Sequence, residues 1–562
     1  MRTPLLVVGL DGATFDLIEP LVAAGQLPVL AGLMARGAWC RLRSTLPAAT
    51  FPAWTSLVTG VNPGRHGLLD FTQREPGSYQ LRFVNGSYRR TPALWTRLSA
   101  AGGRVAAITV PATYPPEPVN GIMVSGFDSP LTTEIDGRFV HPRSFHAEIR
   151  KLVGRLPFAD FQESNIGPGW HAEAQRRLLD GVEKRTVVVE HILAQERWDA
   201  VMVVFGESDT VAHHFWRFAD PRSPRWVASE FGRAVTDVYA ALDAALGRLI
   251  AAAPSDAVVA VVSDHGSGGA SDVGVHINRR LAECGLLRFR PSVGLDAAAQ
   301  VRATVLRLLP HRLQGQALRR MPRAAGRLEG HHRFGGFDWH ETVAFSEELD
   351  YHPNVWLNLR GREPDGVVDP DRYHAVRAAV TAALESWQHP DGTPVVERVW
   401  RREELYEGPA TEAAPDLLLE LTLLDGYSPS CLRSVGAGPS VRRMAPHEFD
   451  AGKGAGMNGA HRRDGVLLLA GPGVRPLRAS VPADIVDVLP TLLALADGVV
   501  PAGLDGQPLG HLLDRAWVEE ADRFGPAAAP GILPGAPYEP YDPEAEAAVA
   551  ARLVALGYLE PS

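Results

Sequence analysis

A chain of 562 residues, 45% of them hydrophobic and 22% charged, is long enough to bury a large core and exceeds the usual size of a single domain. Its 56 Lys and Arg residues against 65 Asp and Glu residues give a formal net charge of −9, which has the wrong sign for a dedicated nucleic-acid binder. No stretch of about 18 apolar residues occurs, so the sequence predicts no membrane span.

The cysteine content and the first residues indicate the compartment. Cys40, Cys284 and Cys431 are far apart and odd in number, which predicts buried thiols in a reducing environment and no disulfide framework. The apolar run at the N-terminus is broken by Asp11 and no cleavage pattern follows, which indicates a first core strand and not a signal peptide. We therefore expect a cytoplasmic protein.

Along the chain, nearly unbroken apolar runs predict strands covered on both faces at residues 5–12, 104–111, 199–207, 256–266 and 464–473. Segments with helical periodicity, such as 28–37 and 228–253, lie between these runs. Because strands and helices alternate, we predict the α/β class, with a doubly wound, mostly parallel sheet flanked by helices.

Acidic and histidine side chains follow three of the predicted strands. Asp11 ends the first run, Asp209 and His213 follow the third, and Asp264 and His265 end the fourth. In open α/β sheets, ligands bind beyond the carboxyl ends of the strands. Asp209 and His213 are four residues apart, so on a helix they would share one face and could hold a divalent metal. The alternative is that Asp209 caps the helix and His213 is an ordinary histidine.

A Gly-rich segment, residues 451–474, brings His461 just before the last predicted strand. Taken alone, His461 would be a polar loop residue. With the acids and histidines at the other strand ends, it becomes a further candidate for metal binding.

Five segments together resemble the alkaline phosphatase superfamily, specifically its type I phosphodiesterase/nucleotide pyrophosphatase family. They read "GLDGATFD" (9–16), "LPAATFPAWTSLVTGVNPGRHGLLDF" (46–71), "SDTVAHHFW" (208–216), "VVSDHGSGG" (261–269) and "NGAHRRDGVLLLAGPGV" (458–474). Residues 354–368, 483–509 and 552–559 also read like bacterial members of this family. Each motif is weak alone, whereas the ordered set covers nearly the whole chain.

The resemblance implies two adjacent divalent metal ions, usually Zn²⁺, with Mn²⁺ as an alternative. It assigns one ion to Asp209, His213 and His461, and the other to Asp11, Asp264, His265 and the oxygen of Thr50. Two ions about 4 Å apart can stabilise both the attacking and the leaving oxygen of an in-line displacement.

The same resemblance makes Thr50, in its "TFP" context, the nucleophile. The alternative is that Thr50 only caps a helix beginning near Pro52. Sulfatases of the superfamily present a Cys/Ser-x-Pro-x-Arg motif, but this chain has Thr50 first and Trp54 in place of the arginine. The sequence therefore disfavours sulfatase chemistry.

One departure concerns substrate binding. Well-known nucleotide pyrophosphatases carry an asparagine about twenty residues after the threonine, and that position falls at or near Phe71. Nucleotide specificity is therefore in doubt. Arg65 and His66, in the same segment, are candidate substrate contacts together with the Phe71 position, and the alternative for them is a structural loop role.

We expect the chain to divide into a phosphohydrolase core at residues 1–283 and 440–515, an inserted cap or lid region with some core elements at 284–439, and a Pro-rich connector with a C-terminal helix at 516–562. Residues 301–328 hold seven arginines and no acid. They predict either a basic lid over an anionic substrate or a solvated face of surface helices.

We interpret the chain as a two-metal phosphohydrolase that cleaves a phosphodiester or phosphoanhydride through a covalent phosphothreonine. The alternatives are a phosphomonoesterase, a phosphotransferase or mutase of the same superfamily, or a catalytically silent phospho-ligand binder. The expected partner is a small phosphorylated substrate. The motifs do not identify it, because enzymes that act on many different esters share them.

Overall fold

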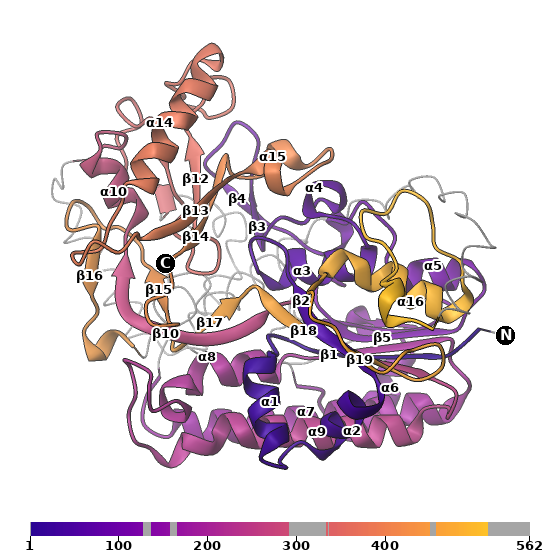
Figure 1. The fold of residues 1–562 in the computed structure, drawn as a ribbon. Coiled ribbons are helices and arrows are strands. Elements are labelled where there is room, and N and C mark those ends of the chain that lie inside the picture. The colour runs from indigo at the N-terminus through magenta and orange to yellow at the C-terminus, as the bar shows by residue number, and fades with distance from the viewer. Residues whose placement is uncertain are drawn as a thin grey trace.

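A ten-stranded core sheet forms the centre of the larger part of the chain (Figure 1). The computed structural model describes residues 2–126, 137–157, 166–290, 333–334, 336–449 and 457–514. The spatial order is β19 (Leu477–Arg478), β2 (Ala38–Arg43), β18 (Asp464–Ala470), β9 (Val258–Val262), β1 (Leu5–Leu10), β8 (Ala200–Phe205), β5 (Val105–Val110), β6 (Gly121–Ser125) and β7 (Val140–His141), with β20 (Ala483–Asp484) paired to β2.

The middle of the core sheet is parallel. β9, β1, β8, β5 and β6 run in one direction, with Leu5 of β1 opposite Ala200 on one side and Val258 on the other. β18 is antiparallel to both of its neighbours, and β7 is antiparallel to β6. The predicted α/β class with a mostly parallel sheet is therefore confirmed, with antiparallel strands outside the parallel centre.

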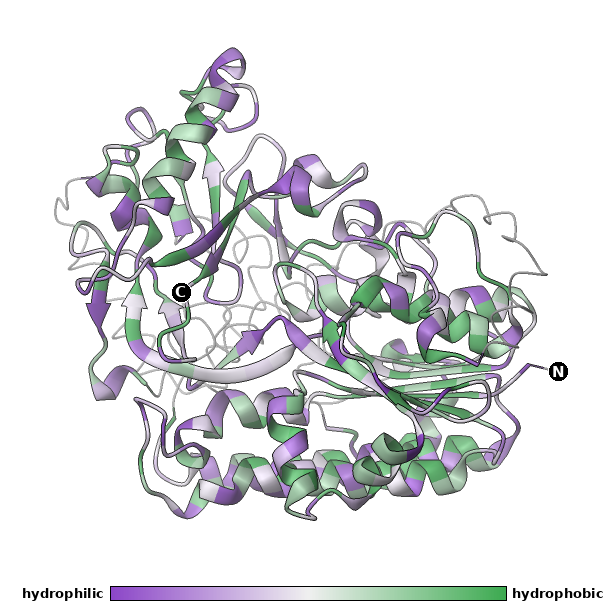
Figure 2. Ribbon diagram, viewed as in Figure 1, coloured by the Kyte–Doolittle hydropathy of each residue, from purple (hydrophilic) through white to green (hydrophobic). Residues whose placement is uncertain are grey.

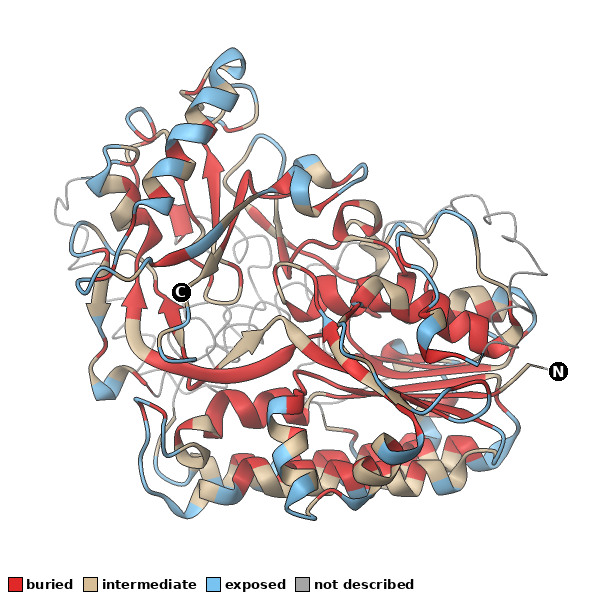
Figure 3. Cartoon of the chain, viewed as in Figure 1, coloured by how far each residue is buried: buried red, intermediate tan, exposed pale blue. Residues whose placement is uncertain are grey.

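Helices cover both faces of the core sheet, which explains the unbroken apolar runs. Side chains alternate between the two faces of a strand, so Leu6 and Val8 of β1 pack on one side while Leu5 and Val7 pack on the other. Burying each such side chain contributes about 1.5–3 kcal/mol. Figure 2 shows these strands as mostly hydrophobic, and Figure 3 shows them as buried.

The helices on one face are α1 (Phe15–Ala23), α2 (Pro28–Arg36), α6 (Phe145–Val153), α7 (Trp170–Gln195), α8 (Glu207–Ala219) and α9 (Ala234–Ala252). The opposite face carries α3 (Thr50–Thr59), α5 (Leu94–Ala100) and α16 (Val488–Asp497), and α4 (Pro63–His66) follows α3 (Figure 1). Short 3₁₀ turns lie at Gly86–Tyr88, Gly137–Phe139, Glu230–Arg233, Pro370–Arg372, Thr411–Ala413, Pro446–Glu448, Ile485–Asp487 and Gly510–Leu512.

A long curved strand, β10 (Gly266–Val275), leads from the core sheet to the upper part of the molecule (Figure 1). It pairs with β17 (Gly459–Arg462) near its start and with β15 (Ser428–Cys431) and β16 (Val441–Arg443) near its end. The predicted strand at 256–266 is therefore two elements, because β9 ends at Val262 and β10 begins only after the Asp264–His265 turn.

A smaller four-stranded sheet, which we call the cap sheet, lies beyond β10. Its order is β11 (Ala344–Phe345), β12 (Asn354–Leu357), β14 (Leu417–Leu421) and β13 (Val396–Arg401), and the helices beside it are α10 (Ile277–Glu283), α14 (Tyr373–Glu385) and α15 (Arg402–Leu405). The hairpin of β3 (Thr72–Arg74) and β4 (Leu81–Phe83) reaches it from the core. Arg74 pairs with Glu363 at 3.0 Å and lies 3.7 Å over the Trp356 ring, so the core and the cap sheet are joined by buried charge and aromatic contact.

Some expectations about the surface require correction or fall outside the described residues. Cys40 and Cys431 are buried free thiols as predicted, but Cys284 is exposed because it ends α10 at the surface. In the described ranges, no single helix is both long and apolar enough to cross a membrane, and α1 with α2 meets those two criteria only as a pair bent by 102°. The Arg-rich segment 301–328 and the tail 516–562 lie outside the described residues.

Candidate active site

The carboxyl ends of three neighbouring parallel strands form the site. β1 ends at Leu10, just before Asp11, β8 leads into α8, and β9 is followed by the turn that carries Asp264. Because these strands are adjacent in the order β9, β1, β8, the side chains that follow them meet at one edge of the sheet, as the sequence predicts.

The first cluster of ligand-type side chains consists of Asp209, His213 and His461. Asp209 Oδ1 lies 2.9 Å from His213 Nε2 and 3.5 Å from His461 Nε2, and the two Nε2 atoms are 3.0 Å apart. The Nδ1 atoms face the carbonyl oxygens of Gly459 (2.9 Å) and Ala48 (2.6 Å). Each Nδ1–H therefore donates to the backbone, which turns Nε2 toward the other side chains of the cluster, where it could bind a metal ion.

Asp209 does not cap α8. The helix begins at Glu207 after Gly206, so Asp209 lies in its first turn, one helical turn before His213. β17 delivers His461 to the same place by running against this helix. A Cβ atom at Gly459 would lie 2.4 Å from the carbonyl oxygen of Ala212, so only glycine permits this approach.

The second cluster consists of Asp11, Asp264 and His265. His265 Nε2 lies 3.3 Å from Asp264 Oδ2 and 3.6 Å from Asp11 Oδ1. These three atoms are buried, and none has a hydrogen-bond partner among the described residues. Leaving buried polar atoms without partners is costly, and a cation held by all three would remove that cost. The donor set therefore fits a metal ion.

The two clusters are adjacent. The His265 and His461 rings stack with their centroids 3.7 Å apart. Burial raises the pKa of Asp11 well above its ordinary value of 3.8, and the charges of Asp264 and Asp209 raise it further. Burial likewise raises the pKa of Asp264, with a further contribution from Asp209. Three carboxyl groups and three imidazoles in two adjacent clusters are side-chain types that suit divalent ions such as Zn²⁺.

Thr50 is flanked in the sequence by two residues, Ala48 and Trp54, that each contact one of the clusters. It is the first residue of α3, is 5% exposed, and its hydroxyl has no hydrogen-bond partner among the described residues. The carbonyl oxygen of Ala48, two residues before Thr50, accepts a hydrogen bond from His461 Nδ1. Trp54, one helical turn after Thr50, donates from Nε1 to Asp11 Oδ2 at 3.1 Å. The N-cap of α3 is Ala49, without a side-chain bond, so the alternative that Thr50 caps the helix is wrong.

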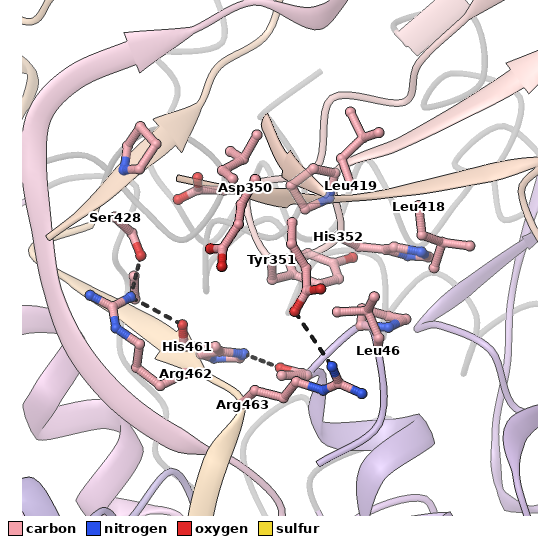
Figure 4. A pocket seen from close by; sticks show the side chains of 18 of the residues that line it. Leu46, Asp350, Tyr351, His352, Leu418, Leu419, Ser428, His461, Arg462 and Arg463 are labelled. Atoms are coloured by element: carbon pink, nitrogen blue, oxygen red, sulfur yellow. Dashed lines mark hydrogen bonds and ion pairs between the residues drawn. The ribbon is translucent and has the colours of Figure 1, made fainter. Parts of the chain in front are cut away.

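A cavity of about 240 Å³ lies between this site and the cap sheet (Figure 4). Its core wall contains residues 46–48 and His461 to Arg463, and its cap wall contains residues 350–353 and 418–421. Arg462 bonds Gly269 and Gly426 carbonyls at 3.0 and 2.9 Å, and Arg463 lies 3.5 Å from Glu420. Burial raises the pKa of Asp350, on the cap wall, to about 6.

The comparisons with known proteins agree with this geometry. A family model described as type I phosphodiesterase / nucleotide pyrophosphatase matches residues 5–429. The chain belongs to this family. It is therefore a phosphoester hydrolase of the alkaline phosphatase superfamily, in a metal-dependent family. The two clusters of ligand-type side chains are consistent with that dependence.

Two solved structures share the fold. Human ectonucleotide pyrophosphatase / phosphodiesterase 5 is 13% identical, with a TM-score of 0.50 over 91% of this chain and 100% of that chain. Phosphonoacetate hydrolase from Sinorhizobium meliloti 1021, solved in complex with phosphonoformate, is 16% identical, with a TM-score of 0.50 over 87% of this chain and 94% of that chain. At these identities, the likeness shows the fold alone.

For His66 and Arg65, the contacts in the structure favour the alternative of a structural loop role. His66 is completely buried, with Nε2 3.0 Å from Ser56 Oγ and Nδ1 accepting from the Leu68 N–H. Burial lowers its pKa to about 3, so it is a neutral structural group in the turn after α3. Arg65 pairs with Asp505 and does not line the cavity.

Phe71 is at or near the position where the resemblance to nucleotide pyrophosphatases places an asparagine. Its ring lies 4.4 Å from Phe51, the neighbour of Thr50, and 5.5 Å from Tyr351, which lines the cavity. Phe71 therefore supports the cavity wall from behind, and its role toward the substrate stays a prediction. The cavity residues from 350 to 353 were not identified from the sequence, whereas Arg462 and Arg463 could have been proposed from their position beside His461.

Replacing His461 with alanine is expected to leave one tightly bound metal ion per chain instead of two. The variant removes a ligand from the Asp209 cluster, while Asp11, Asp264 and His265 remain. Elemental analysis after gel filtration measures the stoichiometry. The matched control is His214→Ala, because His214 is a buried histidine on α8 that packs against Trp170 outside both clusters. Loss of both ions, or retention of both, in the His461 variant would contradict the assignment of two separate clusters.

Proposed function

We propose that this protein is a two-metal phosphohydrolase that cleaves a phosphodiester or phosphoanhydride through a covalent phosphothreonine on Thr50. The observation that carries the proposal is the placement of Thr50, which is linked to one cluster through Ala48 and to the other through Trp54. Among the described residues the Thr50 hydroxyl has no hydrogen-bond partner, so it is available to a substrate phosphoryl group.

The residues that would hold the ions are those of the two clusters, with the Thr50 oxygen as a further ligand. When bound, the two cations supply positive charge that lowers the pKa of the attacking hydroxyl and offsets charge on the oxygens of the phosphoryl group. The bonds from Nδ1 of His213 and His461 to carbonyl oxygens orient both rings with Nε2 toward the cluster, and burial lowers the pKa of His461 to about 3, so that ring is neutral.

The reaction itself takes place at Thr50. Its hydroxyl oxygen attacks phosphorus, the bond from phosphorus to the leaving oxygen breaks, and the leaving group takes up a proton. Water then attacks the phosphothreonine and restores the hydroxyl. Because Thr50 is the first residue of α3, the positive end of the helix dipole favours an anion at this place.

The cavity beside His461 is suited to the organic part of the substrate. Its volume of about 240 Å³ admits a small group, which supports a small phosphorylated substrate and not a polymer. The net charge of −9 supports the absence of dedicated nucleic-acid binding. Three cysteines without a disulfide support the proposal that the enzyme works in the cytoplasm.

We expect the zinc-loaded protein to hydrolyse bis-p-nitrophenyl phosphate with a kcat/KM about tenfold or more above that for p-nitrophenyl phosphate, a difference of about 1.4 kcal/mol. The diester is expected to be preferred because a monoester carries a second negative charge, whereas the two arginines among the described cavity residues already bind protein oxygens. Nucleoside triphosphates and dinucleotides, assayed in parallel, test whether the protein cleaves a phosphoanhydride.

The opposite preference would indicate the phosphomonoesterase alternative. Failure on every substrate with both metals bound would indicate a silent phospho-ligand binder.

A further inference from the structure

Three buried serine hydroxyls converge on one turn of the backbone. Ser208 Oγ donates to the carbonyl oxygen of Asp11 at 2.7 Å, Ser267 Oγ to that of Gly12 at 2.7 Å, and Ser263 Oγ to that of Ala13 at 3.0 Å. The three serines are 0–2% exposed. Successive carbonyl groups of the turn from Asp11 to Ala13 therefore each receive a hydroxyl, one from α8 and two from the segment where β9 leads into β10.

Each serine also lies next to a ligand-type residue. Ser208 precedes Asp209 in α8, Ser263 precedes Asp264, and Ser267 follows His265 by two residues in β10. The turn itself carries Asp11. The hydroxyls thus tie the elements that bear both clusters to the same three peptide groups.

The turn has little room to adjust. Gly12 has φ of +66°, and a Cβ atom there would lie 2.9 Å from Ser267 Oγ and 3.0 Å from Asp209 Oδ1. The Gly12 N–H donates to Asp264 Oδ1 at 3.2 Å. Ser263 Oγ additionally accepts from the Val466 N–H at 2.8 Å, which connects the turn to β18, the strand that follows His461.

We propose that Ser208, Ser263 and Ser267 are positioning residues that hold the Asp11 turn, and with it the Asp11 carboxylate, in the arrangement that binds metal. Asp11, Asp209 and Asp264 repel one another before a cation binds. The serine bonds keep the three strand ends together against that repulsion, so a cation meets a preformed site. The inference rests on the proposed function, because it requires metal binding at these clusters.

The test uses His461→Ala as the parent protein, in which the Asp11 cluster is the remaining complete one. Zn²⁺ affinity is measured by competition with a chromophoric chelator, and the melting temperature of the metal-free protein is measured alongside. Adding Ser208→Ala and Ser267→Ala is expected to weaken Zn²⁺ binding about tenfold or more, in the range seen when groups that orient metal ligands are removed. Each single variant is expected to fall between the parent and the double variant.

Ser125→Ala is the matched control. Ser125 is 0% exposed and donates to the Thr113 carbonyl at 3.0 Å, so this variant loses a bond of the same kind outside both clusters. It is expected to lower the melting temperature without changing Zn²⁺ affinity by more than about twofold, because its bond orients no metal ligand.

Two outcomes are distinguishable. If the serine variants bind Zn²⁺ like their parent and lose only as much melting temperature as Ser125→Ala, the positioning role is overturned and the proposed function stands. If the unmodified protein and the parent both bind no Zn²⁺, the proposed function itself fails.

Discussion

Replacing Thr50 with alanine is expected to lower kcat by about a thousandfold or more, because the variant lacks the oxygen that attacks phosphorus. Metal content is expected to change little, since three protein ligands remain in each cluster. Steady-state kinetics with bis-p-nitrophenyl phosphate, together with elemental analysis of the same preparation, measures both quantities.

Three further variants separate a nucleophile from a structural residue. Thr50→Ser is expected to recover much of the rate because it presents the same oxygen, and Thr50→Cys less because sulfur is larger. Thr59→Ala is the control on the same helix, since its buried hydroxyl bonds the Thr55 carbonyl at 2.6 Å and faces no cluster. We expect it to retain kcat within a few-fold.

The stereochemistry at phosphorus gives an independent test of the same step. Two successive in-line displacements, one by Thr50 and one by water, produce net retention with a chiral phosphorothioate substrate. Inversion, or near-normal turnover by Thr50→Ala, would show that water attacks the substrate directly.

The fold could be predicted where the sequence signal was local. β1, β8 and β9 are short apolar runs, and burial on both faces explains why their composition is unbroken. β10 gave no such signal, because "GSGGASDVGV" is rich in glycine and weak in strand propensity. It is a strand only because β15, β16 and β17 pair with it, and that pairing depends on the tertiary fold.

The candidate site also has residues that local sequence signals predict and residues whose role depends on tertiary contacts. The spacing of Asp209 and His213 and the strand-end positions of Asp11 and Asp264 were enough to predict that these side chains meet. The sequence left two roles open for His66, because its partner, Ser56, is ten residues earlier and comes into reach only when α4 folds back on α3.

The serine contacts could not be predicted at all. Each hydroxyl bonds a carbonyl group 197 to 255 residues away in the sequence, and no local pattern marks a serine as such a donor.

Removing the metal ions with a chelator is expected to abolish turnover, and the stabilisation that Zn²⁺ restores is expected to grow as the pH rises. A buried carboxyl group with a raised pKa favours the folded state while it is protonated, and this contribution is lost as the pH rises through the raised value. Burial raises the pKa of both Asp11 and Asp264 in the metal-free protein. The folded state of the metal-free protein is therefore destabilised at pH values above these raised pKa values, because the ionised carboxylates lack a counter-charge.

Zn²⁺ supplies that counter-charge, but it competes with protons for the same oxygens, so its binding weakens as the pH falls. His461 does not add to this dependence near neutral pH, because burial lowers its pKa to about 3 and it is already neutral. The measurement is the difference in melting temperature between zinc-loaded and chelated protein from about pH 5 to 8, an interval above the ordinary pKa of 3.8 of both carboxyl groups. The difference is expected to increase across that interval in the unmodified protein and to flatten in an Asp11→Asn, Asp264→Asn double variant, which keeps the shape of both side chains without their charge. A difference that stays constant with pH in the unmodified protein, or full turnover after chelation, would show that these two carboxylates do not hold a metal ion.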